Sequence, residues 1–253
     1  MILRRVSVAV PDARAEQARA VMLELFPEGF EELEGNGSLE LAAYTNAAGE
    51  ERIWQAFGGA ASATDVDDNW EERWRQFHRP QRVGSLWIGP PWEPPDEDAI
   101  AVVIDPGRAF GTGGHATTRL CLQLLEAEER GSVLDVGCGS GVLSIAAAKL
   151  GFAPVVGIDF DPQAVEATER NAAANEVGVD VRLGDLRDAE LPAADLALAN
   201  IAGDAVVALG PRLRAPRAIT SGYLVRDDPP LDGYRLERRV QVDGWAADLH
   251  VRN

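Results

Sequence analysis

The sequence predicts an α/β fold built on a parallel sheet, with a small α+β unit before it and an antiparallel hairpin after it. Three observations support this prediction. From Thr117 onward, helical and strand-like segments alternate, as they do in βαβ units. A glycine-rich turn at 133–141 joins one of these strands to a helix. Near the C-terminus, two strand-like segments flank Asp243-Gly244, a dipeptide typical of tight hairpins.

Residues 1–57 are expected to form the small α+β unit. Alternation over 3–10 predicts a strand, an apolar helical face around Met22 predicts a helix, and strands are expected near 30–33 and 39–44. Small and polar residues at 58–65 indicate a linker.

The segment 58–80 combines this linker with an amphipathic helix on which Trp70, Trp74 and Phe77 share one face. Docking of the helix onto its own domain is the simpler interpretation of that face, and substrate binding is the alternative.

Residues 81–253 are expected to form the larger domain. Strand-like segments at 83–88 and 100–104 precede the alternating part. The expected helices of that part lie near 117–129, 141–150, 162–176 and 203–213. The expected strands lie near 132–136, 154–159, 179–183, 194–199 and 216–221, and the hairpin strands at 234–240 and 245–251.

The glycine turn predicts an adenosine pocket. Gly137, Gly139 and Gly141 allow a sharp turn and a close approach of ligand to backbone. Asp159 ends the next strand, where a carboxylate can accept both ribose hydroxyls. The spacing is Gly-x-Gly-x-Gly, preceded by Asp135, rather than the Gly-x-Gly-x-x-Gly of dinucleotide sites. This favours S-adenosylmethionine over NAD as the cofactor.

Composition narrows the class of protein. The chain has 253 residues, 46% of them hydrophobic, and two cysteines without metal-ligand spacing, so we expect no metal and a reducing, cytoplasmic location. We find no signal peptide and no apolar run of membrane length. A formal charge of −17 argues against direct nucleic-acid binding and suits a basic protein partner, although acidity also simply favours solubility.

Two further segments carry polar groups suited to a site. The loop 105–118 contains four glycines, and Thr117 or Thr118 is expected to cap the following helix. Within this loop Arg108 could steer a carboxylate or be solvated. Asn200 follows a strand at the carboxyl edge of the sheet, where ligands bind in such folds.

The motifs together resemble one family. Asp-Asn-Trp-Glu-Glu-Arg-Trp-Arg-Gln-Phe-His-Arg-Pro at 68–80, Phe-Gly-Thr-Gly-Gly-His-Ala-Thr-Thr at 110–118, the Asp-x-Gly-Cys-Gly-Ser-Gly turn and Ala-Asn-Ile at 199–201 occur in the order and spacing of the PrmA family. These are the methyltransferases of large-subunit ribosomal protein L11. The resemblance runs from about 68 to 224 and returns at the final strand.

This resemblance implies a class I methyltransferase domain behind an N-terminal substrate-recognition domain of ferredoxin-like type. It implies transfer of methyl groups from S-adenosylmethionine to lysine side chains and to the N-terminal α-amine of protein L11. The family's cofactor contacts fall on Thr118, Gly137, Asp159 and Asn200. The residues Phe110, Gly111, Thr112 and Gly113 would form the substrate loop.

The chain also departs from the family pattern. The link 214–217 is short, and the segment 225–233 contains two consecutive prolines where the family has a helix, so we expect no helix there. Residues 1–57 match the family only in general character.

The chemistry requires a neutral amine aligned behind a sulfonium methyl group. Asn200 is expected to orient the amine. His115 is a candidate proton acceptor, or it only anchors its loop. Asp185, after the third strand, either contacts the adenine amino group or is a solvated loop acid.

Three alternatives to methylation of L11 stay open. The chain could methylate another protein lysine or a small amine, or it could be a non-catalytic S-adenosylmethionine-binding module associated with the ribosome. A nucleotide-dependent oxidoreductase is disfavoured by the glycine spacing.

Overall fold

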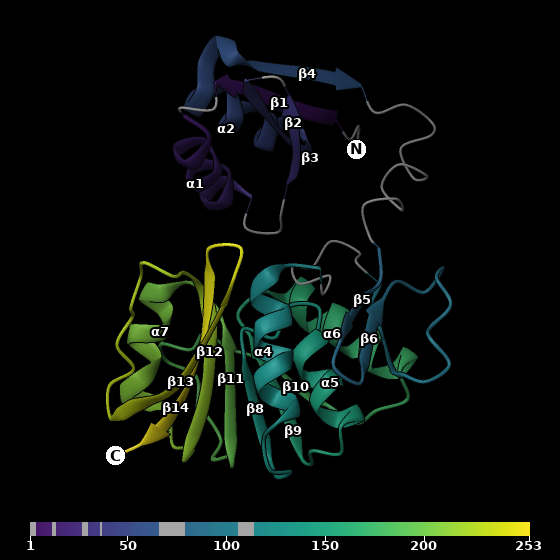
Figure 1. Cartoon of the computed structure of the whole chain (residues 1–253), viewed down its shortest axis with the longest axis vertical. Coiled ribbons are helices and arrows are strands. Elements are labelled where there is room, and N and C mark those ends of the chain that lie inside the picture. The colour runs from purple at the N-terminus through teal and green to yellow at the C-terminus, as the bar shows by residue number, and fades with distance from the viewer. Residues whose placement is uncertain (1–3, 12–13, 27–29, 36, 66–78, 106–113) are drawn as a thin grey trace. The chain divides into compact units, whose positions relative to one another are not determined.

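The chain folds into two compact units, Met1–Phe77 and His78–Asn253, in a computed structural model (Figure 1). The structure describes all residues except 1–3, 12–13, 27–29, 36, 66–78 and 106–113. The helix expected around Trp70, Trp74 and Phe77 therefore lies outside the described residues. No helix in the described ranges is both long and apolar enough to cross a membrane.

The first unit is a four-stranded antiparallel sheet with two helices. Its elements are β1 (Arg4–Pro11), α1 (Ala15–Leu25), β2 (Glu31–Gly35), β3 (Ser38–Thr45), α2 (Ala47–Phe57) and β4 (Ala61–Asp65). The strand order is β2-β3-β1-β4. Met22, Phe26 and Ile53 are fully buried between the helices and the sheet. This βαββαβ arrangement confirms the ferredoxin-like fold.

The prediction of a linker at 58–65 is wrong. After a short 3₁₀ turn (Gly58–Ala60), residues 61–65 form β4, which pairs with β1. Ala61 is buried, and the Ser62 hydroxyl lies 3.0 Å from that of Ser7. Small side chains give a weak strand signal, but here they fit closely against a neighbouring strand. The helix α2 was not predicted either, because Ile53 is its only large buried residue.

The second unit contains the predicted sheet, with seven strands in the order β10-β9-β8-β11-β12-β14-β13. The strands are β8 (Val133–Val136), β9 (Val155–Asp159), β10 (Asp180–Leu183), β11 (Leu196–Asn200), β12 (Arg217–Leu224), β13 (Tyr234–Val242) and β14 (Trp245–Arg252). The first five are parallel, and β14 is antiparallel to both of its neighbours. This arrangement is the class I methyltransferase fold.

Helices cover both faces of this sheet (Figure 1). They are α4 (Ala116–Glu126), α5 (Val142–Lys149), α6 (Pro162–Ala174) and α7 (Gly203–Leu209), which continues as a 3₁₀ turn (Gly210–Arg212). Side chains of α4 and α5 pack on one face in a core that includes Val133 and Leu198. Side chains of α7 pack on the other face with Leu134 and Ala199. A smaller sheet is formed by β5 (Gln81–Val83), β6 (Leu86–Gly89) and β7 (Ile100–Val103).

The C-terminal hairpin has the predicted turn. Val242 pairs with Trp245, so Asp243 and Gly244 alone form the loop, with φ of 50° and 80°. A two-residue type I′ hairpin turn requires positive φ at both of its central residues. The segment 225–233, with its two prolines, contains no helix, as expected.

The turn provides a stability test. Gly244→Ala should destabilise the protein by about 1 kcal/mol, because an alanine at φ 80° is strained although a Cβ there meets no other atom within 4 Å. Gly178→Ala is the matched control, since Gly178 also has open space but no positive φ, and it should be neutral or slightly stabilising. Urea unfolding of both variants measures the difference. Equal effects would show that the Gly244 backbone is not held at positive φ.

Candidate functional site

The glycine turn after β8 is tied to the end of β9. The Gly137 and Cys138 N–H groups both donate to the Ile158 carbonyl, at 2.8 and 3.2 Å. Gly137 has a φ of 76°, and a Cβ there would lie 2.5 Å from the Ile201 side chain. Gly139 and Gly141 also have positive φ. Close packing and backbone conformation therefore both exclude larger residues at Gly137.

Asp159 is held in place by the backbone. One carboxylate oxygen accepts from the Gly139 N–H at 2.9 Å, and the other accepts from the Asp161 N–H at 3.0 Å. Its exposed fraction is 8%. Each carboxylate oxygen has a further lone pair, so Asp159 can still accept hydrogen bonds from a diol while its orientation is fixed.

Asp135 is the most unusual group of the site. It is 1% exposed and faces α5, where one oxygen accepts from the Ser144 hydroxyl at 2.6 Å. Its Oδ1 has no hydrogen-bond partner among the described residues. Burial, with a smaller contribution from the charge of Asp159, raises the pKa of Asp135 to about 7. A buried carboxylate with a free oxygen is suited to a ligand that carries a cation or an N–H group.

Thr118 and Asn200 meet although 82 residues separate them. The Asn200 amide donates to Thr118 Oγ1 at 3.3 Å, and Thr118 is fully buried in the first turns of α4. Asn200 ends β11, and Asp159 ends β9 on the other side of β8. The chain reverses its strand order between β8 and β11, and this is where open α/β sheets bind ligands.

His115 caps α4, so the expectation that Thr117 or Thr118 would do so is wrong. Its Nδ1 lies 2.7 Å from Thr117 Oγ1 and 3.4 Å from the Thr117 N–H. Burial and the charge of Arg119 lower the pKa of His115, so the ring is neutral at pH 7.

Asp185 lies on the loop beside Asp159, but its carboxylate binds a backbone N–H group of its own loop. The N–H of Gly184 donates to the Asp159 carbonyl at 2.8 Å, which places the loop after β10 beside the end of β9. One Asp185 oxygen accepts from the Arg187 N–H at 2.8 Å, as in a common turn. Both interpretations of Asp185 stay predictions.

Other predicted residues cannot be placed. Phe110, Gly111, Thr112, Gly113 and Arg108 lie outside the described residues.

Conversely, sequence reasoning missed two residues beside the site, Ser144 and Trp245. Ser144 faces Asp135 from the first turn of α5. Trp245 follows the hairpin turn, and this position was a usable signal because β14 is antiparallel to β12, so its first residue lies at the carboxyl edge of the parallel strands.

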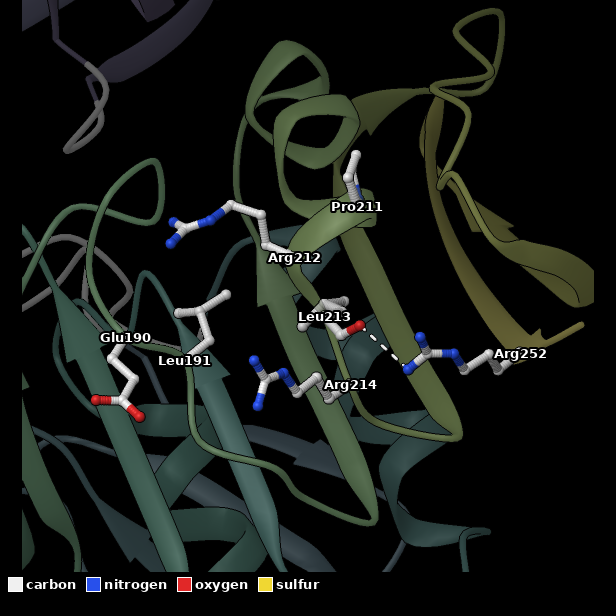
Figure 2. A pocket seen from close by; sticks show the side chains of 7 residues that line it. All are labelled: Glu190, Leu191, Pro211, Arg212, Leu213, Arg214 and Arg252. Atoms are coloured by element: carbon white, nitrogen blue, oxygen red, sulfur yellow. Dashed lines mark hydrogen bonds between the residues drawn. The ribbon is translucent and has the colours of Figure 1, made fainter.

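A cavity of about 430 Å³ lies elsewhere (Figure 2). Its lining residues are Glu190, Leu191, Pro211, Arg212, Leu213, Arg214 and Arg252. These residues precede β11 and β12 or end the antiparallel β14, so the cavity lies at the amino edge of the parallel strands, opposite Asp159 and Asn200. It is not the candidate site. Among the described residues, no group of His, Cys, Asp and Glu is placed to hold a metal ion.

Comparison with known proteins agrees with the geometry. A family model described as ribosomal protein L11 methyltransferase (PrmA) matches residues 14–227. A ribosomal protein L11 methyltransferase of Methylococcus capsulatus is 41% identical over 205 residues, which cover 74% of this chain and 69% of that protein. Its counterpart in Legionella pneumophila is 43% identical over 179 residues, which cover 67% of this chain and 62% of that protein. The match to this second relative thus spans less than two thirds of its length.

A solved structure shares the fold. The ribosomal protein L11 methylase of Lactobacillus delbrueckii subsp. bulgaricus is 27% identical, with a TM-score of 0.63, over 70% of this chain and all of that one.

The raised pKa of Asp135 gives a test with a definite sign. A carboxyl that binds its proton more tightly in the folded protein contributes stability below the unfolded pKa, and this is lost as pH rises through about 7. Asp135→Asn removes this pH-dependent loss of stability, because an amide does not titrate. Between pH 5 and pH 8, the free energy of unfolding of the variant should improve relative to wild type by a few kcal/mol in the ligand-free protein.

Asp195→Asn is the matched control. Hydrogen bonds from Ser132 lower the pKa of Asp195, so its contribution changes only well below pH 5. Urea unfolding at both pH values measures the two differences. An Asp135→Asn difference that does not change with pH would mean that Asp135 is ionised in the folded protein at pH 5.

Proposed function

The chain belongs to the ribosomal protein L11 methyltransferase (PrmA) family, and from this premise we propose that it transfers methyl groups from S-adenosylmethionine to amines of protein L11. The observation that carries the proposal is the meeting of the glycine turn, Asp159 and the Thr118–Asn200 pair at one edge of a class I methyltransferase sheet. We propose lysine side chains and the N-terminal α-amine as the targets.

The residues present fit this cofactor. S-adenosylmethionine carries a ribose diol, an ammonium group and a sulfonium centre. The fixed carboxylate of Asp159 suits the diol, and the glycines leave room for the ligand to lie on the backbone. The Oδ1 of Asp135, which has no partner in the described part of the chain, suits a cationic group. When bound, the cofactor supplies the methyl group on a positively charged sulfur.

Asn200 is the residue that we propose to orient the amine. Because its Nδ2 donates to Thr118, its Oδ1 is fixed as the free end of the amide and can accept an amine N–H. A neutral amine held in this way keeps its lone pair free to attack. No strong base is required, because positioning and exclusion of water supply the rate enhancement.

His115 then anchors α4 instead of accepting the proton. Its Nδ1 faces the Thr117 N–H and hydroxyl, and as an acceptor there it leaves the ring proton on Nε2. A protonated imidazole would lose this cap and place a cation at a helix N-terminus, which is unfavourable. Anchoring therefore accounts for the contacts of His115 better than base catalysis does.

The charge of the chain supports a basic substrate. With 41 acidic and 24 basic residues, the protein attracts cationic partners and repels nucleic-acid phosphates. We propose that the partner is a basic ribosomal protein in the cytoplasm, and that the enzyme binds this protein and not nucleic acid. Incubation of purified L11 with isotopically labelled S-adenosylmethionine, followed by mass spectrometry, tests the function. Absence of label from L11, with label on another protein or a small amine, would assign a different substrate.

Loss of the Asp159 carboxylate should weaken the cofactor site selectively. Asp159→Ala should lower the affinity for S-adenosylmethionine by roughly ten- to a hundredfold, because a hydrogen bond to a charged group contributes about 1.5–3 kcal/mol. Asp188→Ala, an exposed aspartate on the loop after β10, is the control and should bind normally. Calorimetric titration measures both. Unchanged affinity in folded Asp159→Ala would remove this carboxylate from the proposed contacts.

The pH dependence of the rate distinguishes the two classes of target amine. A lysine amine with a pKa near 10.4 is about one part in a thousand neutral at pH 7.4, so log(kcat/KM) should rise by about one per pH unit from roughly pH 6.5 to 9. An α-amine target, with a pKa of about 7.7–8.0, should level off above about pH 8. His115→Ala should leave the slope unchanged.

Single-turnover measurements must show that chemistry limits the rate. An inflection below pH 6.5 that His115→Ala abolishes would instead make His115 the proton acceptor, since burial lowers the pKa of His115. A flat profile would contradict transfer to an amine in equilibrium with solvent.

A further inference from the structure

The turn of the C-terminal hairpin lies against the first turn of α4. The ring of Trp245 meets that of His115 edge to face, with centroids 4.7 Å apart and planes at 73°. Beside it, Arg119 of α4 donates to the Asp243 carboxylate at 3.2 Å. Residues 124 and 130 positions apart therefore meet at the carboxyl edge of the sheet, next to the candidate site.

Trp245 is fixed by the sheet and not by the helix. It pairs with Val242 across the hairpin and with Leu224 on β12, and it packs against the apolar core beneath α4. The indole thus offers a rigid surface on which the His115 ring rests. The Arg119–Asp243 ion pair adds less, because its carboxylate is 70% exposed.

The contacts continue from His115 into the site. His115 caps α4 through Thr117, and the next residue, Thr118, accepts the hydrogen bond from Asn200. The His115 ring is thus in contact with the first turn of α4, which carries Thr118. The aromatic contact with the hairpin therefore adds to the core packing of α4 in holding Thr118, whose hydrogen bond with Asn200 the proposed orientation of the amine requires.

We propose that Trp245 is a positioning residue for methyl transfer: it holds the His115 ring, and through α4 it keeps Thr118 against Asn200. The expected effect of Trp245 on kcat rests on the proposed function. The expected effect on cofactor affinity does not, because it concerns only the cofactor-binding residues and can be measured without any protein substrate.

Three variants test the contact itself. Trp245→Ala should weaken S-adenosylmethionine binding and lower kcat by about two- to tenfold each, in line with the strength of one aromatic pair, while KM for L11 changes little. Trp245→Phe keeps an aromatic ring and should recover most of the loss. Leu236→Ala, an exposed apolar residue on β13 of the same hairpin, is the control and should behave as wild type.

A double-mutant cycle separates positioning from general destabilisation. His115→Asn removes the ring but keeps a residue that caps helices well. If Trp245 acts through the His115 ring, adding Trp245→Ala to His115→Asn should change cofactor affinity less than twofold further. Thermal unfolding of each variant gives its stability separately.

The outcomes are distinct. Additive losses in the cycle, or full cofactor affinity and kcat in Trp245→Ala, would overturn the positioning role. Failure of the wild-type protein to methylate L11 would reject the proposed function, yet the cycle measured by calorimetric cofactor titration would still decide the role of Trp245.

Discussion

The hydrogen bonds between the glycine turn and the end of β9 are the constraint on which the rest of the site depends. The Ile158 carbonyl receives two N–H groups of the turn, and Asp159 receives a third from Gly139. These bonds exist only if β8 and β9 are adjacent and in register, and only if Gly137 adopts a positive φ. The sheet order, the conformation of the turn and the direction of the Asp159 carboxylate are thus determined together. A change in any one of them would misalign the other two.

The strong local signals of the sequence were enough to predict the seven-stranded sheet of the second unit, but not the smaller sheet, since the single strand expected at 83–88 is divided into β5 and β6. Buried parallel strands are continuous apolar runs, the glycine turn has a fixed spacing, and Asp243-Gly244 requires a tight hairpin. The first unit was harder to predict because β4 is made of small residues that become a strand only beside β1. The cap of α4 was missed for a similar reason. Hydroxyl residues usually cap helices, whereas the His115 imidazole that caps α4 is in edge-to-face contact with Trp245, a tertiary contact that the local sequence does not reveal.

Pairs of distant residues mark the limit of sequence reasoning. Asn200 and Thr118 could each be assigned to the carboxyl edge, but their hydrogen bond depends on how α4 packs across β11 and β12. The hairpin is a second case. Asp248, 1% exposed, accepts from Tyr223 at 2.9 Å and from two nitrogens of Arg239 at 2.7 Å each. Such a fully paired buried carboxylate binds three strands together in one geometry. It keeps the hairpin rigid enough for Trp245 to act as a fixed support.

Asp248 and Asp135 show how the same residue type serves opposite purposes. Both are about 1% exposed, but Asp248 is surrounded by donors, while Asp135 has, among the residues that the structure describes, one donor, Ser144, and one oxygen without a partner. A buried polar atom without a partner costs the folded protein free energy, so its presence beside the glycine turn requires a reason outside the apo fold. A cationic cofactor offers such a reason, because its attraction to the Asp135 carboxylate in the complex would offset the free energy that burial of this carboxylate costs. Ligand binding at this site would therefore stabilise the folded protein.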